Sequence, residues 1–168
     1  KIVDSNLSKR LKEMKGFTHT VVTDRIEVAS WACAAFATNG KIFVRNARQT
    51  DMMTFLNKYR QIGGEFEILD DGIWFWRGSS LHAIALETDV HPGFMTDWQQ
   101  PFSILLTMTP GASIVHETVY ENRFGYVDAL NKMGANIQLY KECLGGHPCS
   151  FGQQNPMHSA VITGTTSL

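Results

Sequence analysis

One acid and one arginine lie in two runs of residues that have the potential for chemistry. Asp97 belongs to residues 91–102, His-Pro-Gly-Phe-Met-Thr-Asp-Trp-Gln-Gln-Pro-Phe, and Arg123 belongs to residues 116–124, His-Glu-Thr-Val-Tyr-Glu-Asn-Arg-Phe. A positioned carboxylate such as Asp97 can take a proton from a hydroxyl group. The planar guanidinium of Arg123 presents five donors that suit a phosphate or a carboxylate. The two runs therefore predict a site that combines proton transfer with anion binding.

Both residues also have plain structural explanations. Asp is favoured at helix N-caps, so Asp97 can simply cap the helix that follows it. Pro101 fits best at the first helical position, which would leave Asp97 in the preceding turn, free to face a substrate. Arg123 can form a surface ion pair with Glu117 or Glu121, an interaction that typically contributes about 0 to 1 kcal/mol. The residues alone leave these explanations open beside the functional one.

The two runs resemble the enolpyruvyl transferases, and among them the UDP-N-acetylglucosamine 1-carboxyvinyltransferases. That family carries a Pro-x-Phe-x-Thr-Asp run and then a Glu-Thr-Val-Phe-Glu-Asn-Arg-Phe run at similar spacing, and the match is close at residues 96–97, 117–119 and 121–124. The resemblance covers roughly residues 17–142, since the chain also resembles the family at residues 23–27, 41–46 and 133–135. Family members are two-domain proteins built from six copies of a small β-α-β-α-β-β unit. This chain is therefore expected to be a piece of a longer protein, with about two copies from one domain.

The resemblance implies a specific reaction. The enolpyruvyl group of phosphoenolpyruvate would move to the 3-hydroxyl of UDP-N-acetylglucosamine with release of phosphate, a step of peptidoglycan precursor synthesis that needs no metal and no organic cofactor. Asp97 matches the family's acid that handles the sugar hydroxyl proton, and Arg123 matches a residue that lines the cleft beside it. Thr118 and Val119 match positions that contact the nucleotide sugar, and Thr96 is assigned to the same substrate contacts.

Two further residues are assigned smaller parts in the substrate site. His91 precedes Pro92-Gly93, a turn pair that would hold the imidazole over the cleft. Arg25 begins the first predicted helix and matches a family residue at the rim of the site. The family's reactive cysteine loop and the arginines that hold phosphoenolpyruvate have no match here. The remainder of the parent chain is thus an expected partner, and the isolated chain is predicted to be inactive.

Other functions stay open on the sequence. The shikimate-3-phosphate enolpyruvyl transferase shares the fold and an equivalent acid, although residues 117–124 favour the nucleotide-sugar branch. A non-catalytic ligand-binding or assembly module of the same fold is a second alternative. Relatives of the RNA 3'-terminal phosphate cyclases use the same kind of repeat, but the near-neutral charge argues against an RNA partner.

Residues 17–78 predict a first set of elements that can position these side chains. A capping pattern at Asp24 and Ala-rich helical spacing predict the first helix, and apolar residues at intervals of three and four predict the second. The turn signal Asp70-Asp71-Gly72 predicts a hairpin. The expected elements are a strand at 18–22, a helix at 26–37, a strand at 41–45, a helix at 52–62, and strands at 65–69 and 73–76.

Residues 81–165 repeat this order after roughly seventy residues, the signature of a duplicated supersecondary unit. The expected elements are a strand at 83–88, a helix at 102–108, a strand at 113–116 and a helix at 126–133. Each copy needs the other to cover its apolar helix faces. We therefore expect an α/β (α+β) fold with helices inside and small mixed sheets outside, preceded by a tail over residues 1–16.

Composition excludes several classes of protein. The chain has 168 residues of which 43% are hydrophobic, enough to bury a real core. A formal net charge of -1 gives no broad electropositive field, which argues against nucleic acid as a partner. The apolar stretches are far shorter than the ~20 residues that a bilayer span needs, so no membrane association is expected. A soluble protein of the cytoplasm is the simplest expectation.

The three cysteines are expected to be reduced thiols rather than disulfides. Cys33 lies in an apolar helical run and is expected in the core. A metal cluster could be formed by Cys143, Cys149, His147 and His158, but no Cys-x-x-Cys spacing is present. The favoured interpretation is that these side chains pack or face solvent, so the sequence predicts no metal site.

Overall fold

Within its described residues, the first half of the chain forms two α-helices and one short 3-10 helix over a small antiparallel sheet. The computed structural model describes residues 14–146, 151 and 156–164. The elements follow as helix α2 (Arg25–Ala37), strand β1 (Lys41–Arg45), the short 3-10 helix η1 (Gln49–Asp51), helix α3 (Met53–Gln61), and strands β2 (Gly64–Leu69) and β3 (Gly72–Arg77). The strands lie in the order β1-β3-β2, and both neighbouring pairs are antiparallel.

Local sequence signals fix the ends of these elements as predicted. The side chain of Asp24 accepts a hydrogen bond of 2.8 Å from the backbone N–H of Ile26 and so caps α2. Gly63 follows α3 with φ of +95°, and a Cβ there would lie 2.0 Å from the carbonyl oxygen of Ser80. Glycine is therefore required for both the left-handed conformation and the close approach. The hairpin between β2 and β3 also forms at its predicted turn.

The described residues of the second half form a mixed four-stranded sheet with two helices. Its elements are strand β4 (Ala85–Glu87), helix α4 (Thr96–Met108), strand β5 (Ala112–His116), helix α5 (Val127–Lys132), and strands β6 (Asn136–Tyr140) and β7 (Ser159–Thr163). The strand order is β4-β5-β7-β6, with β4 and β5 parallel and the other pairs antiparallel. Helix, strand, helix and two strands thus follow one another in both halves. The repeat units at 17–78 and 81–165 stay a prediction.

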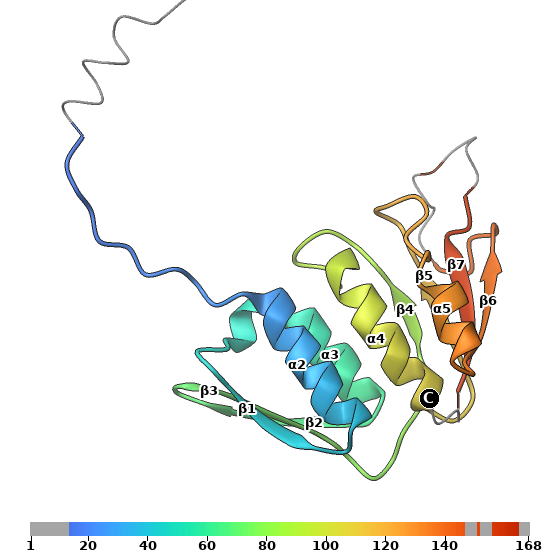
Figure 1. Cartoon of the computed structure of the whole chain (residues 1–168), viewed down its shortest axis with the longest axis horizontal. Coiled ribbons are helices and arrows are strands. Elements are labelled where there is room, and N and C mark those ends of the chain that lie inside the picture. Colours follow the sequence, from blue (N-terminus) through green and yellow to red (C-terminus); the bar gives the residue numbers. More distant parts are fainter. Residues whose placement is uncertain (1–13, 147–150, 152–155, 165–168) are drawn as a thin grey trace, which may run out of the picture.

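Helices α2, α3 and α4 lie between the two sheets, and the predicted fold class is confirmed. Figure 1 shows α2, α3 and α4 side by side, with β1, β2 and β3 on one side and the second sheet on the other. The ring of Phe55 from α3 lies 5.7 Å from Tyr59, 5.5 Å from Trp98 and 5.8 Å from Phe102, measured between centroids. These aromatic side chains are buried and come from both halves of the chain. The two halves therefore share one core.

The strand predicted at residues 18–22 is wrong. This segment is neither helix nor strand, and the side chains of Val21 and Val22 are 82% and 71% exposed. A run of β-branched residues forms a strand when a neighbouring strand pairs with it, and no strand among the described residues does so here.

The start of helix α4 also differs from the prediction. The helix begins at Thr96 rather than at residue 102, and Pro101 lies inside it instead of at its first position. Met95 is the N-cap residue, so Asp97 does not cap the helix, and it lies in the first turn rather than in the turn before it. Pro101 lies beyond the first turn, so it removes one N–H from the intrahelical ladder.

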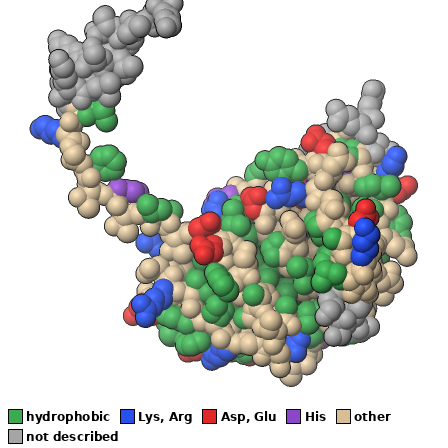
Figure 2. All heavy atoms as spheres, in the orientation of Figure 1, with side chains coloured by type: hydrophobic (Ala, Val, Ile, Leu, Met, Phe, Trp, Pro, Cys, Tyr) green, Lys and Arg blue, Asp and Glu red, His purple; other side chains and the backbone are tan. Residues whose placement is uncertain are grey.

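The surface agrees with the charge expectation. Figure 2 shows Lys and Arg side chains interspersed with Asp and Glu on the face it presents, rather than gathered in one basic patch. None of the helices in the described residues combines the length and the apolar character that crossing a membrane requires.

Candidate active site at the start of helix α4

The structure brings the predicted acid and arginine together. Nη2 of Arg123 donates a hydrogen bond of 3.1 Å to Oδ1 of Asp97, and their side chains are 32% and 40% exposed. The guanidinium also lies 5.3 Å from the centre of the Tyr120 ring. The first turn of α4 favours negative charge through the helix dipole. This end of α4 therefore presents a solvent-accessible carboxylate beside a cation, a combination that can accept a proton and hold an anion.

Glu117 is a residue of this site that the sequence did not single out. Its side chain is fully buried, and it does not pair with Arg123. Oε2 accepts hydrogen bonds from Thr96 Oγ1 at 2.9 Å and from Gln99 Nε2 at 3.3 Å. Oε1 accepts from the backbone N–H groups of Val119 at 2.9 Å and Tyr120 at 3.0 Å. One carboxylate thus holds the start of α4 against the turn that carries Arg123.

A buried polar network continues from Glu117 along α4. The hydroxyl of Tyr126 donates to Oε1 of Gln99 at 3.1 Å and lies 2.8 Å from the hydroxyl of Ser103. Burial raises the pKa of Tyr126, so its phenol stays protonated and able to donate. These contacts fix the orientation of Gln99, one of the two side chains from α4 that hold Glu117.

Thr118 and Val119 lie beside this network but face different ways. Thr118 Oγ1 donates to the carbonyl oxygen of Thr88 at 2.6 Å, which ties it to the end of β4. The N–H of Val119 is already used in the bond to Glu117, so apolar contact through the half-buried side chain is what Val119 can offer a ligand.

His91 and Arg25 form a second pair at the same end of the molecule. Nη1 of Arg25 lies 3.1 Å from Nδ1 of His91, whose bond to Pro92 is cis. Arg25 begins α2, His91 lies in the loop before α4, and Figure 1 shows that both helices begin at this end. No hydrogen bond among the described residues joins this pair to Asp97 or Arg123.

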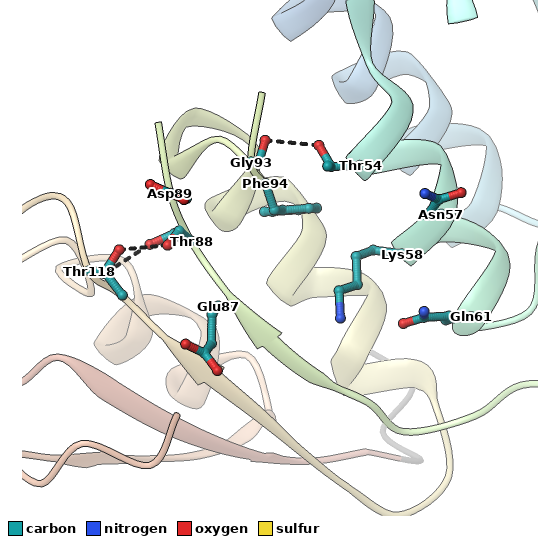
Figure 3. A pocket seen from close by; sticks show the side chains of 10 residues that line it. All are labelled: Thr54, Asn57, Lys58, Gln61, Glu87, Thr88, Asp89, Gly93, Phe94 and Thr118. Carbon is teal, nitrogen blue, oxygen red and sulfur yellow. Dashed lines mark hydrogen bonds between the residues drawn. The ribbon is translucent and has the colours of Figure 1, made fainter. Parts of the chain in front are cut away.

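A cavity of about 540 Å³ lies between α3 and β4, away from the predicted acid. Figure 3 shows Thr54, Asn57, Lys58 and Gln61 facing it from α3, opposite Glu87, Thr88 and Thr118. Of the predicted site residues Thr118 contributes to its described lining, whereas Asp97 and Arg123 do not. Burial lowers the pKa of Lys58, whose ammonium donates to the carbonyl of Ala85 at 2.9 Å. We favour the start of α4 as the site, because a proton acceptor and an anion-binding group meet there.

Comparison with known proteins decides the family. Residues 8–165 match the family model described as EPSP synthase (3-phosphoshikimate 1-carboxyvinyltransferase). The chain belongs to this family. Residues 96–97 and 117–124, which carry the resemblance in the sequence, lie within the matched range of this EPSP synthase family member.

Curated relatives of this chain carry the name UDP-N-acetylglucosamine 1-carboxyvinyltransferase. The chain is 56% identical over 151 residues to a UDP-N-acetylglucosamine 1-carboxyvinyltransferase of Protochlamydia amoebophila, covering 89% of this chain and 32% of the relative. It is 50% identical over 151 residues to the protein of the same name from Chlamydia abortus, covering 89% and 34%. The chain therefore spans about a third of the length of these relatives.

Solved structures of the family share the fold. The enolpyruvyl transferase NikO from Streptomyces tendae superposes with a TM-score of 0.71 at 17% identity, over 87% of this chain and 31% of that one. The EPSP synthase from Acinetobacter baumannii gives a TM-score of 0.54 at 16% identity, over 88% of this chain and 32% of that one. The arrangement of α2 to β7 is thus the enolpyruvyl transferase fold.

Proposed function

We propose that this chain is part of an enolpyruvyl transferase that acts on UDP-N-acetylglucosamine. The whole enzyme would move the enolpyruvyl group of phosphoenolpyruvate to the 3-hydroxyl of the sugar and release phosphate. Two observations support the proposal: the contact between Asp97 and Arg123 at the start of α4, and the names of relatives that are 56% and 50% identical. Peptidoglycan precursor synthesis in the cytoplasm, and through it cell-wall growth, cell shape and division, is the wider process that we propose.

Asp97 and Arg123 have complementary roles in this proposal. The sugar hydroxyl must lose a proton as its oxygen bonds to the substituted vinyl carbon, and Asp97 is a partly exposed carboxylate that can accept it. At the same time the CH2 carbon takes up a proton and becomes a methyl group, through an acid that the remainder of the parent chain would supply. Loss of phosphate from the substituted carbon and of one proton from the methyl group then restores the vinyl double bond. Arg123 would hold an anionic group of a substrate beside Asp97, because its guanidinium is partly exposed and fixed by its bond to that carboxylate.

The other predicted residues would line the substrate around this pair. Thr96 is buried and holds Glu117, so its part is to position Asp97 rather than to contact the sugar directly. Val119 offers an apolar contact, and Thr118, His91 and Arg25 would extend the binding surface. The remainder of the parent chain would supply the groups that bind phosphoenolpyruvate, and we expect the isolated chain not to release phosphate.

The test is phosphate release by the full-length parent enzyme with UDP-N-acetylglucosamine and, separately, with shikimate 3-phosphate. We expect turnover with the nucleotide sugar, and Asp97→Asn should lower kcat by about 100- to 10,000-fold. Arg123→Ala should also impair turnover. Asp128→Asn is the matched control, because Asp128 is an exposed acid in the first turn of α5. Turnover with shikimate 3-phosphate alone would assign the other branch of the family, and full activity after both site substitutions would indicate a role outside catalysis.

A further inference from the structure

Three potential metal ligands meet at one end of the second sheet. His116 ends β5, Cys143 follows β6 and His158 immediately precedes β7. The strands β5, β7 and β6 are neighbours in the sheet, with Ser159 opposite both His116 and Tyr140. Pairing of the strands therefore brings together residues that are distant in the sequence. One ligand atom from each of the three side chains lies within 4.8 Å of the others.

The ring of His158 is oriented as a ligand would be. Its Nδ1 lies 2.8 Å from the carbonyl oxygen of Pro156, which places the proton on Nδ1. Nε2 then carries a lone pair, and it lies 3.3 Å from Sγ of Cys143. A backbone carbonyl that fixes the tautomer of a histidine is an ordinary partner of metal-bound imidazole.

His116 is a buried polar group that the described contacts leave unexplained. Its side chain is 0% exposed, and neither ring nitrogen makes a hydrogen bond within the described part of the chain. Buried polar groups without partners are uncommon in folded proteins, because they lose their hydrogen bonds to water without a replacement. The hydrogen bond between Cys143 and His158 engages two members of the group, whereas His116 has the longer contact of 3.8 Å between its Nδ1 and Oε2 of Glu87. A shared ion would account for all three.

We propose that His116, Cys143 and His158 bind a transition-metal ion, with zinc as the best fit. A thiolate and two imidazoles are donors that zinc prefers, and three protein ligands leave a fourth position that solvent can fill beside the exposed Cys143. Tetrahedral zinc would hold these atoms about 3.3 to 3.6 Å apart. The distance of 3.3 Å between Sγ of Cys143 and Nε2 of His158 is already in this range. Because all three ligand atoms lie within 4.8 Å of one another, the His116 ring has to move by about 1 Å to bind the same ion.

Glu87 lies where its carboxylate could accept a hydrogen bond from a metal-bound His116. Its Oε2 lies 3.8 Å from Nδ1 of His116, and its Oε1 accepts a hydrogen bond of 2.7 Å from the N–H of Gly146. With the metal on Nε2 of His116, the proton on Nδ1 faces this carboxylate, the usual arrangement around metal-bound histidine. Binding would release the thiol proton of Cys143 to solvent, since the thiolate is the ligand.

The proposed metal site adjoins the candidate active site without sharing its residues. His116 precedes Glu117, the buried carboxylate that holds the turn of Arg123, and the N–H of Glu117 donates to the carbonyl of His158 at 2.8 Å. A metal ion would fasten the ends of β5, β6 and β7 directly behind that turn. Its role would therefore be structural, since the ion stabilises the fold by binding the folded state.

Metal titration of the full 168-residue chain, free of affinity tags and kept reduced, tests this proposal. After removal of metal with a chelator, Zn²⁺ and Co²⁺ are added, and zinc affinity is measured by competition with a chromophoric chelator. We expect one ion per chain and a thiolate-to-cobalt charge-transfer band. Cys143→Ser should abolish that band and weaken zinc binding by about 100-fold or more.

Cys33→Ala is the matched control, because it removes a thiol buried in α2, far from these ligands in the fold. This variant should keep both the band and the affinity. Far-ultraviolet circular dichroism checks that each variant is folded. The cobalt spectrum of the unsubstituted chain tests the proposal even if a variant fails to fold. Absence of stoichiometric binding to the unsubstituted chain, or binding by Cys143→Ser equal to it, would overturn the proposal.

Discussion

Thr96 donates a hydrogen bond of 2.9 Å to Glu117, and this contact joins the start of α4 to the turn after β5. The side chains of Thr96 and Glu117 are 5% and 0% exposed. Asp97, which follows Thr96, and Arg123, which lies in the turn after Glu117, form the partly exposed ion pair. A surface ion pair typically contributes only about 0 to 1 kcal/mol of stability. The buried contact is therefore what keeps the acid and the arginine together.

Glu117→Gln should destabilise the fold and disturb the candidate site. The amide nitrogen of Gln cannot accept a hydrogen bond, so it would face donors such as Thr96 or the N–H groups of Val119 and Tyr120. Hydrogen bonds to buried charged groups are worth about 1.5 to 3 kcal/mol each, so we expect a loss on the order of 3 kcal/mol. Urea unfolding of the chain measures this loss.

Glu121→Gln is the control for that measurement. Glu121 is an exposed residue of the same turn, and its substitution should change stability by less than about 0.5 kcal/mol. Equal stability of the two variants would show that the buried carboxylate does not hold the turn.

Asp24→Ala should destabilise helix α2. Its side chain accepts the hydrogen bond of 2.8 Å from the N–H of Ile26, and alanine leaves that donor without its cap. Loss of such a cap costs about 0.5 to 2 kcal/mol. Asp24→Ser keeps a capping oxygen and should retain most of the stability in the same urea experiment. A serine variant as unstable as the alanine variant would argue that capping is not the role of Asp24.

Features determined by neighbouring residues were predictable, and features determined by distant contacts were not. The cap at Asp24 and the turn at Gly63 depend on a few adjacent residues, and both appear where the sequence predicts them. The strand at residues 18–22 failed because pairing partners are not encoded locally. Glu117 was considered as a surface partner of Arg123, whereas burial at the junction of α4 and β5 makes it the centre of a network.

The metal ligands illustrate the same limit. The sequence drew attention to Cys143 and His158 together with His147 and Cys149, which lie outside the described residues. His116 was not considered, since it lies in a run assigned to substrate contacts and shares no spacing motif with Cys143. The order β5-β7-β6 is what brings His116 to the group. Strand order is known only from the fold, so the sequence alone could not include His116 among the metal ligands.

Phe55→Ala should destabilise both halves of the chain together. Phe55 is fully buried, and its ring contacts Tyr59 of the first half and Trp98 and Phe102 of the second. Removing such a ring from a core costs about 3 to 5 kcal/mol. Circular dichroism and tryptophan fluorescence should report one common transition at a lower urea concentration. Phe17→Ala is the control, because the Phe17 side chain is 84% exposed. Two separate transitions would contradict a shared core.

Stability should fall at alkaline pH because buried acids, among them Cys33 and Tyr59, keep their protons in the folded state. Burial raises the pKa of the Cys33 thiol, and burial together with the nearby Cys33 raises the pKa of Tyr59. In the unfolded chain these groups ionise near about 8.5 and about 10. The unfolded state then binds fewer protons than the folded state, so stability is full below pH of about 8.5 and decreases as pH rises.

Urea unfolding at a series of pH values from neutral to alkaline tests the origin of this decrease. Each group contributes a slope approaching about 1.4 kcal/mol per pH unit once it is ionised in the unfolded chain alone. Cys33→Ala should therefore reduce the change of unfolding free energy with pH in the lower part of this pH range. Tyr59→Phe should flatten the upper part, and it also loses the bonds of 3.2 Å that the Tyr59 hydroxyl donates to the carbonyl oxygens of Ala32 and Trp76. An unchanged slope in both variants would mean that other groups, rather than this buried pair, set the alkaline limit of the fold.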